Sequence, residues 1–267
     1  MPELPDVEVF RRYVDATALH KTIHDVDIQA ERILEGSSSR SFTRALKGKA
    51  FESSRRHGKY LCLELTNGRW LVLHFGMTGS LKYFLHSEDE PDYTYALFTF
   101  SNDYHLAFLN PRKLGTLAIY DSVAALIEDK DLGPDPLEVG FTFEDFKHVL
   151  QGRRGMLKST LMNQSILAGI GNVYSDEILF QLGWYPRGKV DRLDEEGLHA
   201  FYRTMRHVLR EAAEREADPA RFPDSWLIPH RRPGASCPRC RGEVQKIKVV
   251  GRSGYFCPAC QKKLGST

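Results

Sequence analysis

The sequence lacks any long apolar run. No stretch approaches the roughly 18 residues that a membrane-spanning helix needs, and charged residues begin at Glu3. The N-terminus therefore predicts neither a signal peptide nor a membrane anchor. The composition is also unbiased, with 42% hydrophobic and 27% charged residues, which excludes disordered, collagen-like and fibrous chains. We expect an intracellular protein of bacterial type, located in the cytoplasm, with no membrane partner.

The chain has no large excess of one charge sign, because its formal net charge is only +2. The charges are nevertheless unevenly placed. Residues 231–267 carry nine lysines and arginines against the single acidic residue Glu243, so the remainder of the chain is mildly acidic. A basic end on an acidic body is typical of a segment that contacts a polyanion, although a solvated basic surface explains the same asymmetry.

Cysteine is scarce, and four of the five cysteines form two CxxC pairs, Cys237/Cys240 and Cys257/Cys260, separated by 16 residues. Disulfides are not expected in a protein without an export signal. Two CxxC pairs at this spacing predict one structural zinc ion held by four thiolates, which leave no open coordination position for catalysis. The fifth cysteine, Cys62, lies in an apolar run and is interpreted as a buried small hydrophobic residue.

The length of 267 residues favours more than one domain. The first part begins with a candidate helix that starts near Pro5, and it then changes to a two-residue apolar period. Asn67-Gly68 between two of the apolar segments is a hairpin signal. We predict an N-terminal antiparallel β-sandwich with a flanking helix. Its predicted strands cover residues 60–65, 70–75, 95–100 and 104–109.

Gly133-Pro134-Asp135-Pro136 marks a predicted domain boundary, after which the apolar period becomes helical. The strongest predicted helix runs from Asp194 to Arg215, and residues 217–236 are proline-rich and predicted to be a loop. Shorter helices are predicted near Phe143–Leu150, near Met156–Met162 and from Asp176 to Leu182. The predicted class is α+β multidomain, with a β-sandwich over 1–132, a helical domain over 133–230 and a zinc ribbon over 231–267.

The start Met1-Pro2-Glu3 offers a possible nucleophile. Removal of Met1 before the small residue Pro2 would leave a secondary amine, which titrates well below a lysine and can attack a carbonyl carbon. Glu3 stands beside it as a candidate proton shuttle. Taken alone, a Met-Pro start is common and usually has no chemical meaning.

Several motifs give this start more weight. Residues 2–8 (PELPDVE) closely resemble the start of the formamidopyrimidine-DNA glycosylase and endonuclease VIII family. RHGKYL at 56–61 resembles its lysine strand, GMTGSL at 76–81 its GMSGSL turn, and GIGNVY at 169–174 the core of its helix-two-turn-helix motif. Arg252 lies five residues before the third zinc-site cysteine, as in the family's zinc finger. The motifs cover nearly the whole chain in the family's order.

The resemblance implies a DNA glycosylase with AP lyase activity for base-excision repair, which needs no organic cofactor and binds double-stranded damaged DNA. Pro2 would displace the oxidised base at C1′ and form a Schiff base with the opened sugar, while Glu3 protonates the ring oxygen. Lys59 would contact phosphate and assist elimination. Arg252 and Asn172 would hold phosphates near the flipped nucleotide.

Further DNA contacts follow from the same resemblance. Arg154 and Lys158 match basic positions of the DNA-facing surface. A flipped base leaves a gap in the duplex, which Met77 would fill while Arg112 pairs with the orphaned base. Leu114 stands where the family usually has a wedge phenylalanine, and an aliphatic wedge can also insert between bases.

Five departures from the family pattern weigh against a preference for 8-oxoguanine. They are Leu114, Asp6 in place of a glutamate, Asn163 in place of an aspartate, Tyr93 where the family often has a DNA-contacting histidine, and a short, proline-rich segment over 217–232. The main hypothesis is removal of 8-oxoguanine and formamidopyrimidine-type purines. The alternatives are the same chemistry on oxidised pyrimidines or hydantoins, and a non-catalytic protein that binds damaged DNA. We expect a monomer that associates with the nucleoid.

Overall fold

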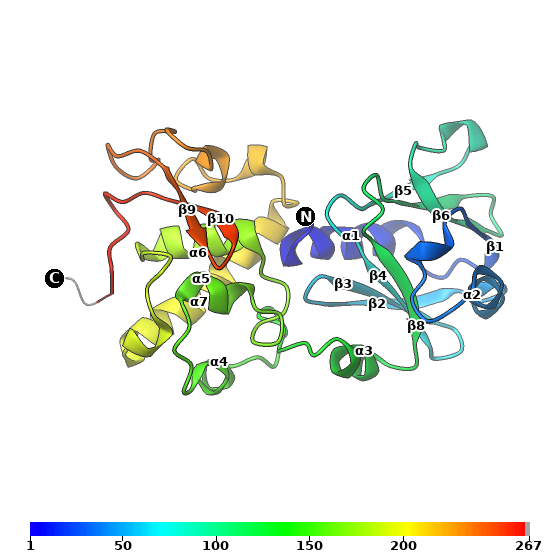
Figure 1. Ribbon diagram of the computed structural model, residues 1–267. Helices are drawn as coiled ribbons and strands as arrows, with labels where there is room; N and C mark the ends of the chain where they lie inside the picture. Colours follow the sequence, from blue (N-terminus) through cyan, green and yellow to red (C-terminus); the bar gives the residue numbers. More distant parts are fainter. Residues whose placement is uncertain (265–267) are drawn as a thin grey trace. The chain divides into compact units, whose positions relative to one another are not determined.

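The computed structural model describes residues 1–264, which form two compact units. The first unit contains Met1–Pro2 and Asp6–Lys130. The second contains Glu3–Pro5 and the chain from Asp131 onward (Figure 1). Among the described residues, no helix has the length and apolar character that crossing a membrane would require.

The first unit is built on two four-stranded antiparallel sheets. One has the strand order β1-β6-β7-β5 and the other the order β2-β3-β4-β8. Their bounds are β1 Ile23–Ile28, β2 Phe51–His57, β3 Tyr60–Leu65, β4 Trp70–His74, β5 Ser80–Phe84, β6 Thr94–Phe100, β7 His105–Leu109 and β8 Thr116–Tyr120. This architecture confirms the predicted β-sandwich, and β3, β4, β6 and β7 match the four predicted strands.

The side-chain pattern explains how the two sheets pack. In β6 every second residue is buried, so Ala96, Phe98 and Phe100 face the core while their neighbours are more exposed. β4 is buried along most of its length because a second apolar cluster covers its other face. That cluster includes Cys62 and Leu126, which lies on helix α3 (Val123–Asp129). Burial raises the pKa of the Cys62 thiol to about 12, as expected for a buried hydrophobic cysteine.

Three helices accompany the sandwich: α1 Leu4–Thr17, α2 Ser39–Leu46 and α3 Val123–Asp129. α1 contributes Val7 and Val14 to the sandwich core, which confirms the predicted flanking helix. The connection between β3 and β4 contains Asn67 and Gly68, as predicted. Gly68 has a φ of 79°, a conformation that glycine adopts without steric cost.

In the second unit, α5 and α7 pack against α6, which is buried over most of its length, and α4 packs against α7 (Figure 1). Their bounds are α4 Phe143–Leu150, α5 Leu157–Met162, α6 Asn172–Leu182 and α7 Glu195–Glu214. α7 begins as predicted, because the carboxylate of Asp194 accepts a hydrogen bond from the Gly197 amide at 2.8 Å. α6 begins four residues before the predicted Asp176, which therefore lies inside the helix instead of at its start.

The last part of the described chain is a β-hairpin of β9 Gln245–Val249 and β10 Arg252–Phe256. It carries the cysteine pairs at its base, as the predicted zinc ribbon requires. The chain before it is a loop, as predicted, interrupted only by single helical turns. Such 3₁₀ turns occur at η1 Glu31–Ile33, η2 Ser87–Asp89, η3 Val190–Arg192, η4 Pro219–Arg221 and η5 Ile228–His230.

Candidate functional site

The Glu3 side chain is fixed at the N-terminus of α6. Its carboxylate accepts hydrogen bonds from the backbone amides of Gly171 at 2.7 Å, Val173 at 2.9 Å and Tyr174 at 3.2 Å. The side chain is 2% exposed. The first amides of a helix have no partner within the helix and favour negative charge, so this end of α6 is a natural carboxylate site. The family-like motif at 169–174 thus holds Glu3 in a defined place.

Gly171 is required by the same contact. A Cβ atom at this position would lie 2.4 Å from Cδ of Glu3, closer than any real side-chain contact. The segment is also tied to the chain start by a hydrogen bond from the Leu4 amide to the carbonyl oxygen of Gly169 at 3.0 Å. The second glycine of Gly-Ile-Gly-Asn is therefore explained by the approach of the Glu3 carboxyl group.

Pro2 directly precedes Glu3 and is half-buried. Because Glu3 is fixed by three amides, the position of its covalent neighbour is restricted as well. Removal of Met1, which is 45% exposed, would leave the Pro2 nitrogen as the terminal amine beside a positioned carboxylate.

Asn172 is the first residue of α6. Its carbonyl oxygen accepts hydrogen bonds from Lys158 Nζ at 3.0 Å and from Arg231 Nη2 at 3.3 Å. Its side-chain Oδ1 is buried and has no hydrogen-bond partner among the described residues. A buried polar atom without a partner at a helix N-terminus is a suitable element of a binding site.

Lys158 lies in the interior and is fully buried. Its ammonium group donates hydrogen bonds to Asp176 Oδ1 at 2.6 Å, to Ser175 Oγ at 2.8 Å and to Asn172. Burial lowers the pKa of Lys158 and raises that of Asp176. This location does not fit the direct DNA contact that the resemblance predicts for Lys158, because its charge is already occupied inside the unit.

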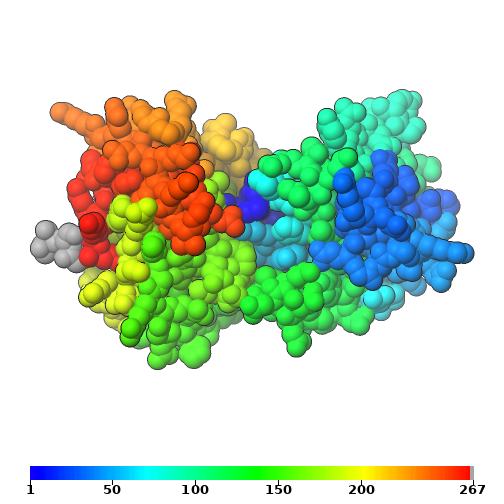
Figure 2. Space-filling view, viewed as in Figure 1, coloured from blue at the N-terminus to red at the C-terminus, as the bar shows by residue number. Residues whose placement is uncertain are grey.

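Arg252 begins β10 and is exposed. It follows a two-residue turn in which Val250 and Gly251 both have positive φ values, 45° and 75°. That pattern is the one found in type I′ hairpin turns, which hold their flanking residues in a tight register. Arg252 is therefore an exposed residue of a defined hairpin. The segment that forms this hairpin, orange to red in Figure 2, reaches the surface of the second unit.

In the first unit, Lys59 lies in the turn between β2 and β3. The resemblance to the family's lysine strand suggests a position inside a strand instead. The preceding Gly58 has a φ of 56°, so the two residues form a tight hairpin loop. Lys59 is only 8% exposed. Burial, followed by the nearby Lys59 charge, lowers the pKa of His74 and favours its neutral form.

Met77 and Leu114 are exposed apolar residues on two turns that touch each other. Their exposed fractions are 40% and 51%. A Cβ atom on Gly76 would lie 2.4 Å from the carbonyl carbon of Leu114, so the turns pack backbone against backbone. Arg112 is exposed on the second of these turns. The first unit thus brings together the three residues predicted to fill the gap in the duplex.

The four cysteine sulfurs form one cluster, with all Sγ atoms within 4.8 Å of one another. The Sγ atoms of Cys237 and Cys260 are 3.7 Å apart, and those of Cys240 and Cys257 are 3.6 Å apart. Tetrahedral zinc with Zn–S bonds of about 2.3 Å requires sulfur separations of about 3.8 Å. The residues therefore fit a structural zinc ion, which would hold the base of the β9–β10 hairpin.

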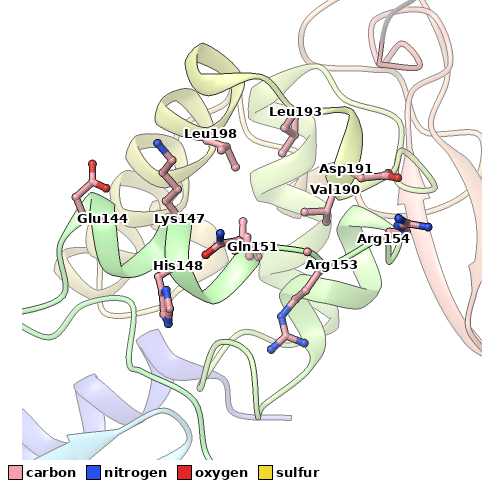
Figure 3. Close-up of a pocket in the computed structure, with 12 residues that line it drawn as sticks. Glu144, Lys147, His148, Gln151, Arg153, Arg154, Val190, Asp191, Leu193 and Leu198 are labelled. Carbon is pink, nitrogen blue, oxygen red and sulfur yellow. The ribbon is translucent and has the colours of Figure 1, made fainter.

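Arg154 is exposed and lines a pocket of about 630 Å³ in the helical part of the second unit (Figure 3). The pocket wall combines apolar residues of α4 and α7 with the basic side chains of Lys147 and Arg153. Glu3, Asn172 and Arg252 do not line it. Among the two basic residues predicted to face DNA in this region, only Arg154 is accessible.

Family models match three successive parts of the chain. The formamidopyrimidine-DNA glycosylase N-terminal domain matches residues 1–117, the formamidopyrimidine-DNA glycosylase H2TH domain matches 132–224, and the zinc finger found in FPG and IleRS matches 236–263. The chain belongs to the formamidopyrimidine-DNA glycosylase family. It is a DNA glycosylase with AP lyase activity.

Relatives of this glycosylase agree over its full length. Formamidopyrimidine-DNA glycosylase of Heliobacterium modesticaldum is 36% identical and that of Pelotomaculum thermopropionicum 33%, with 98% of this chain and at least 99% of each relative covered. Among solved structures, Lactococcus lactis Fpg (MutM) bound to N7-benzyl-Fapy-dG DNA has a TM-score of 0.87 at 28% identity. MutM bound to carbocyclic 8-oxo-G DNA has a TM-score of 0.88 at 28% identity. Both comparisons cover 98% of this chain and all of the other.

The structure also contains internal contacts that the sequence analysis did not predict. Asp176, which is fully buried, forms an ion pair with the partly buried Arg231 at 2.8 Å, and Gly171 makes room for Glu3. One available signal is the pair Asp176-Glu177 inside the mostly apolar segment from Val173 to Leu182. Adjacent acidic residues in a buried helix need partners, which predicts internal cations or amides.

Proposed function

We propose that this chain removes oxidised purines from DNA through a covalent intermediate on Pro2 and then cuts the strand at the abasic site. The enzyme is a base-excision repair glycosylase that acts on oxidised purines and has DNA as its partner. The observation that supports the mechanism most strongly is the Glu3 carboxylate, which three amides at the start of α6 hold next to the candidate nucleophile.

The covalent step begins on the Pro2 amine after loss of Met1. The nitrogen lone pair forms a bond to C1′, the glycosidic bond breaks, and its electron pair leaves with the base, which takes up a proton. Opening of the sugar breaks the bond between C1′ and the ring oxygen and gives an iminium ion. A secondary amine suits this chemistry because its iminium carries a permanent positive charge that draws electrons from the sugar.

Glu3 supplies the proton transfers of this sequence. The Glu3 carboxylate takes up the proton that the Pro2 nitrogen loses after it bonds to C1′, and it passes that proton to the ring oxygen when the sugar opens. Removal of the C2′ proton then expels the 3′ phosphate, and water releases the sugar from Pro2. The burial of Glu3 and its three amide contacts fix one carboxylate position for these transfers, which limits the reorganisation that each transfer requires.

Phosphate contacts hold the damaged strand in this proposal. Arg252 on the hairpin and Asn172 at the start of α6 bind phosphates near the extruded nucleotide, and Lys59 assists elimination. Exposed Arg154 adds a further contact. Met77 and Leu114 fill the gap that the extruded base leaves, and Arg112 contacts the base opposite. An exposed apolar wedge of this kind offsets part of the cost of unstacking.

The experiment is a lesion panel with purified enzyme of verified N-terminal mass. Duplexes carry 8-oxoguanine, a formamidopyrimidine purine, an oxidised pyrimidine or an abasic site, and borohydride traps the iminium. We expect the strongest base release with the two purine lesions. Pro2→Gly and Glu3→Gln should reduce trapping and cleavage while DNA binding remains.

The panel also tests the effect of the unusual residues, since Leu114 and the short 217–232 segment differ from the usual family pattern. Preferred release of the oxidised pyrimidine would contradict the proposed substrate class but keep the chemistry. Binding without trapping on every duplex, by enzyme with a free Pro2, would contradict the catalytic proposal and favour a lesion-binding protein.

We further propose that the enzyme acts as a monomer associated with the nucleoid, where its DNA substrate lies. Sedimentation of the free protein and of its complex with one lesion duplex tests the first part. A one-to-one complex is expected, whereas two chains per duplex would contradict it.

A further inference from the structure

The second unit contains a buried ion cluster that no step of the proposed mechanism uses. It consists of Lys158 on α5, Asp176 on α6 and Arg231, which follows η5. Lys158 and Asp176 are both fully buried, and 17% of the Arg231 side chain is exposed. A charged cluster in a protein interior is costly unless every group is paired, so its retention calls for a specific role.

The two carboxylate oxygens of Asp176 contact different partners. Oδ1 accepts a hydrogen bond from Lys158 Nζ at 2.6 Å. Oδ2 accepts one from Arg231 Nε at 2.9 Å and one from the backbone amide of Tyr255 at 3.1 Å. Tyr255 lies on β10, so a single carboxylate links α5, α6, the 231 segment and the hairpin.

Two further contacts fix β10 over this cluster. The guanidinium of Arg231 lies 4.6 Å from the centre of the Tyr255 ring, within the range of a cation–π contact. A Cβ atom on Gly254 would lie 2.9 Å from both Asp176 Oδ1 and Lys158 Cε. The backbone of β10 therefore crosses directly over the ion pair, and only glycine fits at the crossing.

Arg252 lies three residues before Tyr255 on the same short strand, at a distance of about 10 Å along an extended chain. The tight turn at Val250-Gly251 directly precedes Arg252 and fixes the N-terminal end of β10. β9 has a contact of its own, because Arg187 Nη2 donates to the Lys248 carbonyl oxygen at 2.7 Å, but Arg187 is exposed. The hairpin also packs Ile247, Val249 and Phe256 against Met156 and Tyr185. The Asp176 cluster adds a buried polar anchor on β10.

We infer that Asp176 is a positioning residue: together with Arg231 and Lys158 it clamps β10 to α6 and thereby places Arg252 for its DNA phosphate. This inference rests on the phosphate contact of Arg252 in the proposed function. The same cluster also holds the carbonyl oxygen of Asn172, through Lys158 and Arg231. Arg252 and Asn172, which both bind phosphates in the proposed function, therefore share one internal support.

The first test measures the hairpin without DNA. Hydrogen exchange of residues 245–256 is followed in the full-length, zinc-loaded wild type and in Asp176→Asn and Arg231→Gln. Exchange of these amides should become at least about tenfold faster in both variants, with zinc content unchanged. Arg232→Gln is the control, because Arg232 is the exposed neighbour of Arg231. Unchanged hairpin exchange in the Asp176 variant would overturn the inference.

A charge-balanced variant guards against simple misfolding. Lys158→Met combined with Asp176→Leu removes both fully buried charges of the cluster. Arg231 loses its carboxylate partner but is 17% exposed and keeps its hydrogen bond to the Asn172 carbonyl oxygen. The double variant should melt close to the wild type and still show fast hairpin exchange. Normal hairpin exchange in this variant would show that β10 needs no carboxylate anchor, which also overturns the inference.

The second test is a double-mutant cycle on binding to a duplex with a tetrahydrofuran abasic analogue. In the wild type, Arg252→Gln should weaken binding and lower the slope of log K against log salt by about 0.9, as expected for one lost phosphate contact. In the charge-balanced background the same change should alter binding less than twofold. Equal effects of Arg252→Gln on binding in both backgrounds would overturn the inference that the cluster positions Arg252. No effect of Arg252→Gln in the wild type would instead contradict the phosphate role, while hydrogen exchange still decides the anchor.

Discussion

The two units place their candidate functional residues in opposite environments. The first unit has an apolar sandwich core and carries Met77, Arg112 and Leu114 on exposed turns. The second unit keeps polar groups inside, where Glu3 and Asp176 are 2% and 0% exposed. For the three turn residues of the first unit, function and folding are therefore nearly separable, whereas Lys59 of the same unit is only 8% exposed. For Glu3 and Asp176 of the second unit, function and folding depend on the same buried contacts, so substitutions there should change both.

Gly171→Ala is expected to have the largest effect on activity, because it disturbs a buried contact of the second unit. The added Cβ would meet the Glu3 carboxyl group at 2.4 Å, so Glu3 must move. A displacement of about 1 Å at a reacting group costs on the order of 100-fold in rate. We expect kcat/KM for strand cleavage to fall by at least about that factor.

Gly140→Ala is the matched control, since a Cβ atom added to Gly140 would have no other atom within 4 Å and the φ of this residue is not positive. Its kcat/KM should stay within about twofold of the wild type. Full activity of Gly171→Ala would show that the position of Glu3 is unimportant for cleavage.

Zinc removal tests whether the second unit loses function when part of its fold is lost, while the first unit stays folded. The hairpin and the cysteine-bearing segments around it contain only small apolar clusters, so their fold depends on the four thiolates. Treatment with a strong chelator should release one zinc ion per chain and abolish lesion binding, while the sandwich stays folded by near-ultraviolet circular dichroism. Added zinc should restore binding, and retained binding without zinc would contradict a structural role.

Glu177 gives a pH-dependent prediction. It is fully buried, and burial raises its pKa from 4.5 to about 7. The folded protein therefore keeps this proton through a range in which the unfolded chain releases it. Stability should accordingly fall as pH rises from about 4.5 to about 7.

Glu177→Gln removes this contribution and retains an acceptor for the Ile228 amide, which in the wild type donates to the Glu177 carboxylate at 2.9 Å. The variant should gain stability relative to the wild type between about pH 5 and pH 8, by up to about 3 kcal/mol. Urea unfolding at several pH values measures the difference. A difference that does not vary with pH would contradict the raised pKa.

Met77→Ala should have the smallest effect on the fold. Met77 is 40% exposed, so the free energy of unfolding should change by about 0.5 kcal/mol or less. Binding to a lesion duplex should still weaken several-fold if the side chain fills the gap in the stack. Titration of lesion and undamaged duplexes in parallel measures this, and a large loss of stability would show that Met77 belongs to the core.

Much of the architecture could be predicted from the sequence because its signals are local. Alternating residues in β6, the Asp194 cap of α7 and the spacing of the four cysteines each specify an element directly. Strands such as β2, with FESSRRH, lack that alternation, so their sequence alone does not predict them. Their pairing with a neighbouring strand supplies the stability that their own pattern does not indicate.

In the candidate site too, local sequence motifs predict some residues, and others depend on contacts that the motifs do not indicate. The residues recognised by motif resemblance, such as Glu3 and Arg252, are those that contact the DNA substrate directly in the proposed function. The groups that support them depend on contacts between distant segments. Local pattern favours a helix start at Asp176, because acidic residues prefer that position, and a surface position for Lys158, because lysines are mostly exposed. Each is buried instead because the other supplies its opposite charge.

The central claim is that Pro2, placed beside the fixed Glu3, is the nucleophile. The most direct measurement is to trap the enzyme with borohydride on abasic DNA, digest the protein with trypsin and map the modified peptide by mass spectrometry. The account predicts that the sugar adduct lies on the peptide from Pro2 to Arg11, at the Pro2 nitrogen. An adduct on Lys59 or another lysine, with an unmodified Pro2, would contradict it.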